Sequence, residues 1–297
     1  NGSLILVSNE PDTRYQILSG CEESVVYDGS EGNDTTGATG FILEGGAKVT
    51  ISGATTGLTE GITITGAAAE VTILEGATLG SNQIITAESG SSVIINADGG
   101  TFNITEQQAA AKIVGVNLTN GGVFRMSDAF ASLGTEAEKI AINMSGNSLI
   151  TLRNGNTWAA RNLWADILIE DTARIGGSTN GNASTIRGTI AGNGSLELIQ
   201  SESSAKYQIS SSISDGPGSE DVLSVLVSSG NPVINGNNSY TGGTTVTGGI
   251  LTAGSANALG TGAVSVTGGT LVIDSNMVLG GTLTVGAEGT VTVSQTG

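Results

Sequence analysis

The residues most suited to chemistry in this chain form one charged cluster, which consists of Asp166, Glu170, Asp171 and Arg174. Carboxylates beside a cation are the groups with which glycan-cleaving enzymes work. Burial of Ile167 and Ile169 in a strand would turn Asp166 and Glu170 outward, about 13 Å apart along the strand. Glycosidase carboxylates stand about 5 to 9.5 Å apart. Catalysis would therefore need a carboxylate from a neighbouring segment, and a solvated acidic face is the alternative interpretation.

Aromatic residues supply a second candidate, a binding site made of Trp158, Arg161 and Trp164. Both tryptophans of the chain lie in this short stretch. A tryptophan ring can present an apolar face to a sugar or to a protein partner. Packing of at least one ring into the core is the alternative interpretation.

Several other kinds of site are excluded or weakly supported by residue type. The chain has no histidine and a single cysteine, Cys21, which excludes Ser-His-Asp and Cys-His catalysis, the usual zinc ligands and an internal disulfide. The acidic, glycine-containing residues 28–34 lack the register of known calcium loops and indicate a turn. Asparagines such as Asn143 and Asn147 are expected to serve turns or side-chain ladders. We expect no metal and no cofactor.

The net charge limits the partners. With 27 acidic and 10 basic residues, the formal charge is −17, which repels phosphate backbones and anionic membrane surfaces. Nucleic acid is therefore not an expected partner. The first residues lack the basic region of a signal peptide, and no stretch is long and apolar enough to span a membrane as a helix. We therefore expect a soluble whole or a mature fragment, with no membrane insertion by this segment.

Short β-branched runs recur along the chain and predict its fold. Val-Thr-Ile at residues 49–51 returns at 71–73 and as Val-Ile-Ile at 93–95, a period of 22 residues. A second ladder is expected to contain residues 62–64, 84–85, 102–104 and 123–124. Apolar and polar residues alternate in these runs, so each strand would bury one face. Stacked turns of this kind define an all-β fold, the parallel β-solenoid.

Glycines and asparagines between the runs are expected to form the corners. They include Gly45, Gly46, Gly66, Gly76, Gly90, Asn96, Gly99, Gly100, Gly121 and Gly122. We expect a right-handed β-helix of about 20 to 22 residues per turn. Short excursions of helical or irregular structure are expected at residues 106–112 and 128–139, and a loop at residues 201–218.

The last quarter of the chain carries the most specific motif. Residues 245–251 read Thr-Val-Thr-Gly-Gly-Ile-Leu and return at residues 265–271 as Ser-Val-Thr-Gly-Gly-Thr-Leu. Asn-Gly-Asn-Asn-Ser-Tyr-Thr-Gly-Gly precedes them at residues 235–243, and Ala-Leu-Gly-Thr-Gly-Ala-Val lies between them at residues 258–264. Residues 235–271 resemble the passenger-associated transport repeat of autotransporters, also called the autotransporter-associated β-strand repeat.

The resemblance implies a β-helical passenger that a C-terminal translocator barrel carries across a Gram-negative outer membrane. Strands suited to such a barrel do not follow residue 281. We therefore expect residues 1–297 to be a single β-helical passenger fragment, with the barrel outside this chain, or a relative of such passengers that has lost or never had the barrel. Either would be placed extracellularly or at the cell surface.

The passenger is expected to act as an adhesin, a self-association module or a structural stalk. Its partner would be a glycan or protein on a host or neighbouring cell, or another copy of the chain. The alternative is a β-helical polysaccharide lyase or glycoside hydrolase, which would use the cluster around Asp166.

Overall fold

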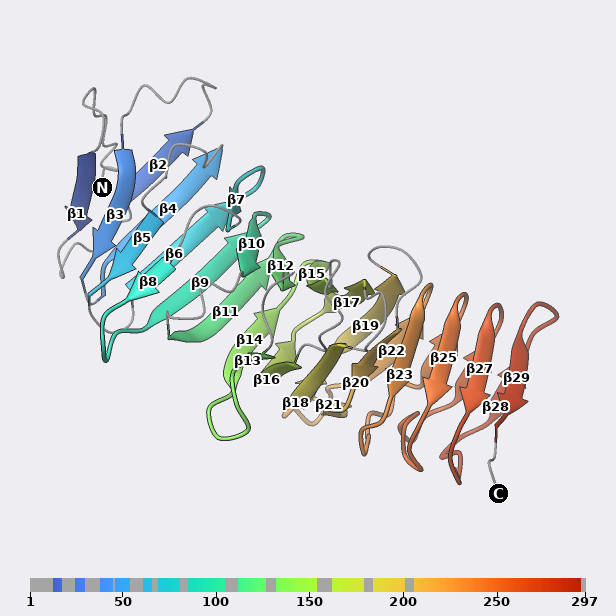
Figure 1. The fold of residues 1–297 in the computed structure, drawn as a ribbon. Helices are drawn as coiled ribbons and strands as arrows, with labels where there is room; N and C mark the ends of the chain where they lie inside the picture. Colours follow the sequence, from blue (N-terminus) through green and yellow to red (C-terminus); the bar gives the residue numbers. More distant parts are fainter. Residues whose placement is uncertain are drawn as a thin grey trace. The chain divides into compact units, whose positions relative to one another are not determined.

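The computed structural model describes residues 13–17, 25–29, 38–44, 46–53, 61–65, 69–80, 85–104, 112–126, 132–153, 162–178, 184–200 and 206–294. Every regular element among these residues is a β-strand, and the strands pair in parallel with equivalent strands of neighbouring turns (Figure 1). The predicted parallel β-solenoid is therefore confirmed. The strands belong to two compact units, residues 1–125 and 126–297. Right-handedness, and a single body for the whole chain, stay predictions.

The first unit contains one major sheet and two smaller ones. The major sheet runs in the order β2 (Val25–Gly29), β4 (Lys48–Gly53), β6 (Ala69–Leu74), β9 (Val93–Asp98) and β11 (Ile113–Thr119). One small sheet contains β1 (Thr13–Ile17), β3 (Ala38–Leu43), β5 (Gly61–Ile64) and β8 (Ile85–Ala87). The other contains β7 (Thr78–Leu79), β10 (Thr101–Ile104) and β12 (Val123–Met126).

Alternation along each strand produces the core of this unit. In β6, buried and half-buried residues alternate without a break. Val49, Ile51, Val71 and Ile73 are completely buried, because in a strand every second side chain points to the same face. Burial of an aliphatic side chain of this size stabilises a fold by about 1.5–3 kcal/mol.

The register of the first unit departs from the 22-residue alignment of the sequence. Val49 pairs with Val71 as predicted, but Val71 pairs with Ile95, and Val93 pairs with Ala69. The slip is two residues, which keeps the same side chains on the core face because the strand period is two. The predicted second ladder is wrong in one respect: β8 belongs to one small sheet, whereas β10 and β12 belong to the other.

The second unit contains two sheets. Its major sheet runs through β14 (Ile140–Met144), β16 (Asn162–Ile169), β18 (Ser184–Gly192), β20 (Lys206–Ile209), β23 (Asn231–Ile234), β25 (Ile250–Ala253), β27 (Thr270–Ile273) and β29 (Thr290–Val293). Its minor sheet runs through β15 (Ser148–Arg153), β17 (Thr172–Ser178), β19 (Gly194–Gln200), β22 (Leu223–Val227), β24 (Thr244–Val246), β26 (Val264–Val266) and β28 (Leu283–Val285). The expected turn length holds here, since Leu251 pairs with Leu271 and Leu271 with Val291.

Two expected excursions can be compared with the structure. In residues 128–139, the described part is the short strand β13 (Ser132–Leu133) followed by an irregular segment. Residues 106–111 lie outside the described residues. The loop expected at residues 201–218 is wrong in part, because β20 and β21 (Ser212–Asp215) lie within it. Tyr207 and Ile213 are completely buried there, and alternation around them was the available sign of a strand.

Left-handed backbone occurs at many of the predicted corners. Gly46, Gly76, Gly90, Gly99 and Gly121 all have positive φ, a conformation that costs glycine nothing. The prediction for Asn96 is wrong, since it lies within β9. Among the asparagines, Asn147 does adopt positive φ, at +60°.

Candidate functional site

Asp166 lies on the outward face of β16. Ile167 and Ile169 are buried and Asp166 is exposed, as the alternation along this strand predicted. Its Oδ1 accepts a hydrogen bond from the Thr189 hydroxyl at 2.8 Å and lies 3.5 Å from Lys139 Nζ. The carboxylate is therefore paired on both sides with side chains of the same face.

Asp171 and Arg174 hold the corner of the preceding turn instead of facing Asp166. Asp171 Oδ1 and Oδ2 accept from the Gly146 N–H at 2.8 and 3.1 Å, and Oδ1 also accepts from the Thr172 N–H. Arg174 donates from Nε and Nη2 to the Asn147 carbonyl at 3.2 and 3.0 Å. Both side chains thereby stabilise a corner with left-handed backbone at positions 146 and 147.

The three candidate acids and the candidate base are thus distributed over two sheets and the corner between them. Asp166 belongs to the major sheet, Arg174 to the minor sheet, and Glu170 and Asp171 to the connection. Glu170 is exposed, and its backbone N–H donates to the Met144 carbonyl at 3.0 Å. Asp166, Asp171 and Arg174 therefore form contacts that stabilise the fold. These contacts do not add support to the glycan-cleaving alternative.

Trp164 is half-buried on the same outward face as Asp166. The Arg187 guanidinium lies over its ring, with Cζ 5.4 Å from the ring centroid, and Arg187 Nε donates to Asn162 Oδ1 at 3.0 Å. A cation over an aromatic face is attractive, so the ring is held in place while part of it stays accessible. Trp158 and Arg161, the other members of the predicted binding site, lie outside the described residues.

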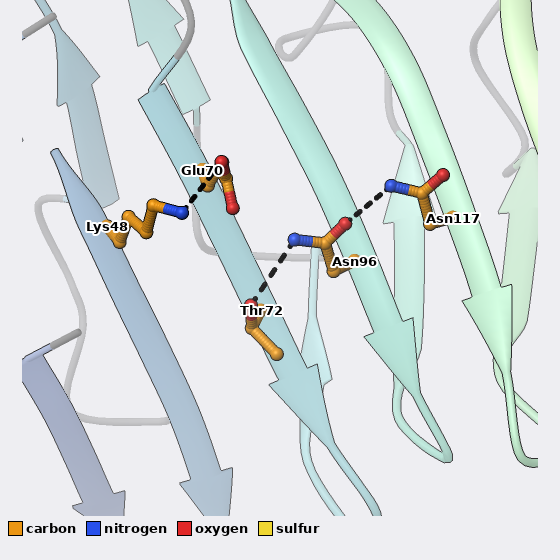
Figure 2. Close-up of polar contacts among 5 residues, drawn as sticks. All are labelled: Lys48, Glu70, Thr72, Asn96 and Asn117. Atoms are coloured by element: carbon orange, nitrogen blue, oxygen red, sulfur yellow. Dashed lines mark hydrogen bonds and ion pairs between the residues drawn. The ribbon is translucent and has the colours of Figure 1, made fainter. Parts of the chain in front are cut away.

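Polar contacts join neighbouring strands on the outward face of the major sheet in the first unit (Figure 2). Asn117 Nδ2 donates to Asn96 Oδ1 at 2.7 Å, and Asn96 Nδ2 donates to Thr72 Oγ1 at 3.4 Å. Lys48 Nζ lies 3.1 Å from Glu70 Oε1 on the same face. Each of these contacts joins residues that are register partners in adjacent turns, so the contacts help to keep neighbouring turns in register.

The conspicuous motif residues Asn238 and Tyr240 are buried. Asn238 Oδ1 accepts from the Ile213 N–H at 2.8 Å, and its Nδ2 donates to the Ala258 carbonyl at 2.6 Å, so one side chain joins three successive turns. The Tyr240 hydroxyl is 2.6 Å from Thr244 Oγ1. Since Thr244 Oγ1 donates to the Leu259 carbonyl at 3.2 Å, tyrosine is the donor in that pair. Burial raises the pKa of the Tyr240 hydroxyl above its ordinary value, so the neutral form that donates this hydrogen bond is the one the fold holds.

The Thr-Gly-Gly corners of the motif stack directly on one another. Gly249 and Gly269 have φ of +71° and +66°. A Cβ on Gly249 would lie 2.4 Å from the Gly230 carbonyl oxygen, and one on Gly269 would lie 2.5 Å from that of Gly249. The corner therefore requires glycine for its backbone conformation and for the close approach of the next turn.

Asp215 anchors the connection that precedes the motif. Its Oδ1 accepts from the Leu223 N–H at 2.8 Å and from the Thr241 N–H at 3.1 Å. Burial raises the pKa of this carboxyl, but the hydrogen bonds outweigh burial and the net pKa is lowered. The charged form is therefore the one that the fold stabilises.

The part of the chain that the structure describes can be compared with the requirements of a metal site and of a membrane-spanning helix. No group of three or more potential metal-ligating side chains occurs in it. A shallow depression lies beside Asp98 and Asn120, where Asp98 Oδ1 accepts from Asn120 Nδ2 at 2.6 Å. Of the candidate calcium loop, Asp28 and Gly29 belong to β2, and residues 30–34 are not described. The described residues contain no helix long and apolar enough to cross a membrane.

Comparison of the chain with known proteins found no match. No protein-family model matches it, no curated protein matches it, and no solved structure matches it. The assignment that the fold and these contacts support is therefore the class of parallel β-solenoid proteins.

Proposed function

We propose that the chain is a surface-exposed or secreted passenger of the autotransporter type, which acts through its outward side faces as a stalk, an adhesin or a self-association module. The observation that carries the proposal is the use of the motif at residues 235–271. Gly249 and Gly269 allow each corner to pack directly against the corner of the preceding turn, and the Asn238 side chain forms hydrogen bonds to the turns before and after it. The residues that resemble the passenger repeat are thus the ones that stack one turn of the solenoid on the next.

A solenoid of this kind needs no catalytic centre to act. Its outward faces present rows of polar side chains at the strand spacing of about 4.8 Å, and extended surfaces of this type are what repeat proteins use for contact. Trp164 beside Arg187 is the place at which we expect a glycan or protein to be held, since a partly accessible ring and a cation are available together.

Cell-surface exposure tests the proposal. Intact cells of the native organism would be treated with a protease and probed with antibody against this chain, alongside the culture medium. Loss of the intact chain from whole cells, or its release into the medium, is expected, while a cytoplasmic protein remains uncut. Complete protection of the chain until the cells are lysed would contradict the proposal.

A further inference from the structure

A long charge-free stretch lies within the second unit. Residues 222–273 contain no Asp, Glu, Lys or Arg, although the whole chain carries a formal charge of −17. The strands from β22 to β27 fall in this stretch. Surfaces normally intersperse charges of both signs, which keeps copies of a protein apart. Here several successive turns present side faces without any charge.

The outward face of the major sheet is the most apolar side of this stretch. Val233 pairs with Thr252, and Thr252 pairs with Val272. Ile250 lies beside them on β25 and is 43% exposed. The row continues to β29, where Thr292 pairs with Val272. Aliphatic and threonine side chains therefore form two parallel columns on this face: Val233, Thr252, Val272 and Thr292 in one, and Ile250, Thr270 and Thr290 in the other.

The minor sheet provides an internal comparison. Its outward row in the same turns contains Leu226, Thr245 and Ser265, which follow one another in register. Only one of these three side chains is aliphatic. The two faces therefore share a lack of charge and differ in apolar area, and apolar area is what drives association.

We propose that the outward face of β23, β25, β27 and β29 is a contact surface for a second copy of this chain. Two copies with a charge of −17 each repel over most of their surfaces, so a neutral face is where they can approach most closely. β-Branched side chains on sheet faces interdigitate when two sheets pack about 10 Å apart. The same face on both copies makes an isologous, two-fold contact.

The size of the face sets the strength of the contact. Four strands at about 4.8 Å spacing and about four residues each cover roughly 15 Å by 13 Å. This area is about 200 Å², whereas stable complexes bury about 800 Å² on each partner. The contact is therefore weak and exchanges rapidly. Display of many copies side by side raises its effect through effective concentration.

Sedimentation velocity of the purified chain over a wide concentration range tests the inference. The weight-average sedimentation coefficient is expected to rise with concentration and not to fall when salt is added, since salt screens the repulsion between acidic copies. Thr252→Lys places a strongly hydrated charge within the proposed contact on both copies, which association would have to desolvate, and is expected to weaken association by about tenfold or more.

Thr245→Lys is the matched control. Both threonines are half-buried and outward, in consecutive strands that belong to different sheets of the same turn, and both changes alter the net charge equally. Val272→Lys against Ser265→Lys repeats the comparison one turn later. Circular dichroism and the unfolding midpoint establish that each variant is folded. A wild-type chain that stays monomeric, or equal effects of Thr252→Lys and Thr245→Lys, would overturn the inference.

The inference rests on the proposed function, because it names one surface and one partner for a passenger-type solenoid. The two can fail separately. Sedimentation of purified protein does not depend on where the chain is located in the cell, and protease accessibility does not depend on association. Binding of a neutral glycan by a strictly monomeric chain would reject the second copy and leave the passenger proposal standing.

Discussion

Replacement of Gly249 by alanine is expected to lower the free energy of unfolding of the second unit by about 2 to 5 kcal/mol. Gly249 has φ of +71°, and left-handed backbone costs an L-residue roughly 1–2 kcal/mol. The added Cβ would stand 2.4 Å from the Gly230 carbonyl oxygen, and relief of such crowding costs about 1–3 kcal/mol. The two costs add because one is local and the other arises between turns.

Two further glycine variants separate these costs. Gly121 has φ of +81° with no atom within 4 Å of the added Cβ, so Gly121→Ala is expected to show only the backbone cost of roughly 1–2 kcal/mol. Gly230 occupies the equivalent corner one turn before Gly249, has φ of +79°, and its Cβ would be 3.1 Å from the nearest atom. Gly230→Ala is therefore expected to fall between the other two.

Denaturant unfolding provides the measurement. Tryptophan fluorescence follows the second unit, which contains both tryptophans of the chain, and far-ultraviolet circular dichroism follows the Gly121 variant. The slope of free energy against denaturant should stay constant, so that the midpoint reports stability. If Gly249→Ala costs no more than Gly121→Ala, the close stacking of corners is not what requires glycine.

Three other changes test the remaining contacts. Asp171→Ala should lower the free energy of unfolding by about 1–3 kcal/mol through loss of charged hydrogen bonds, whereas Glu170→Ala should change it by less than about 0.5 kcal/mol; equal effects would contradict the corner role. Because the fold lowers the pKa of Asp215, its contribution is present above the unfolded pKa and disappears as pH falls through the folded one. Asp215→Asn should therefore lose less stability than wild type between about pH 5 and pH 2; identical acid profiles would contradict this. Tyr240→Phe should cost about 1 kcal/mol through the lost bond to Thr244, measured by thermal unfolding, and an unchanged midpoint would refute it.

Much of the candidate site was accessible from sequence, and part of it was not. Alternation in the segment around Asp166 predicted the outward carboxylate and the buried isoleucines, since a strand has a period of two whatever surrounds it. The use of Asp171 and Arg174 at the preceding corner was not predictable, because their partners at positions 146 and 147 lie about 25 residues away and depend on the turn length. The Asn238 contacts were hidden for the same reason, since Ile213 and Ala258 lie 25 and 20 residues away, although the place of Asn238 in a repeated motif drew attention to it.

Sequence alone determined the class of fold. A period of about 20 to 22 residues, β-branched alternation and glycine between the runs can be satisfied together only by stacked parallel turns, because no single turn buries its own apolar row. The tertiary structure decided the register, the assignment of strands to sheets and the partners of each polar side chain. These depend on how many residues each connection uses before the chain returns to the stack. A two-residue slip preserves the apolar pattern, so the pattern cannot distinguish one register from the other, and only packing of complete turns selects between them.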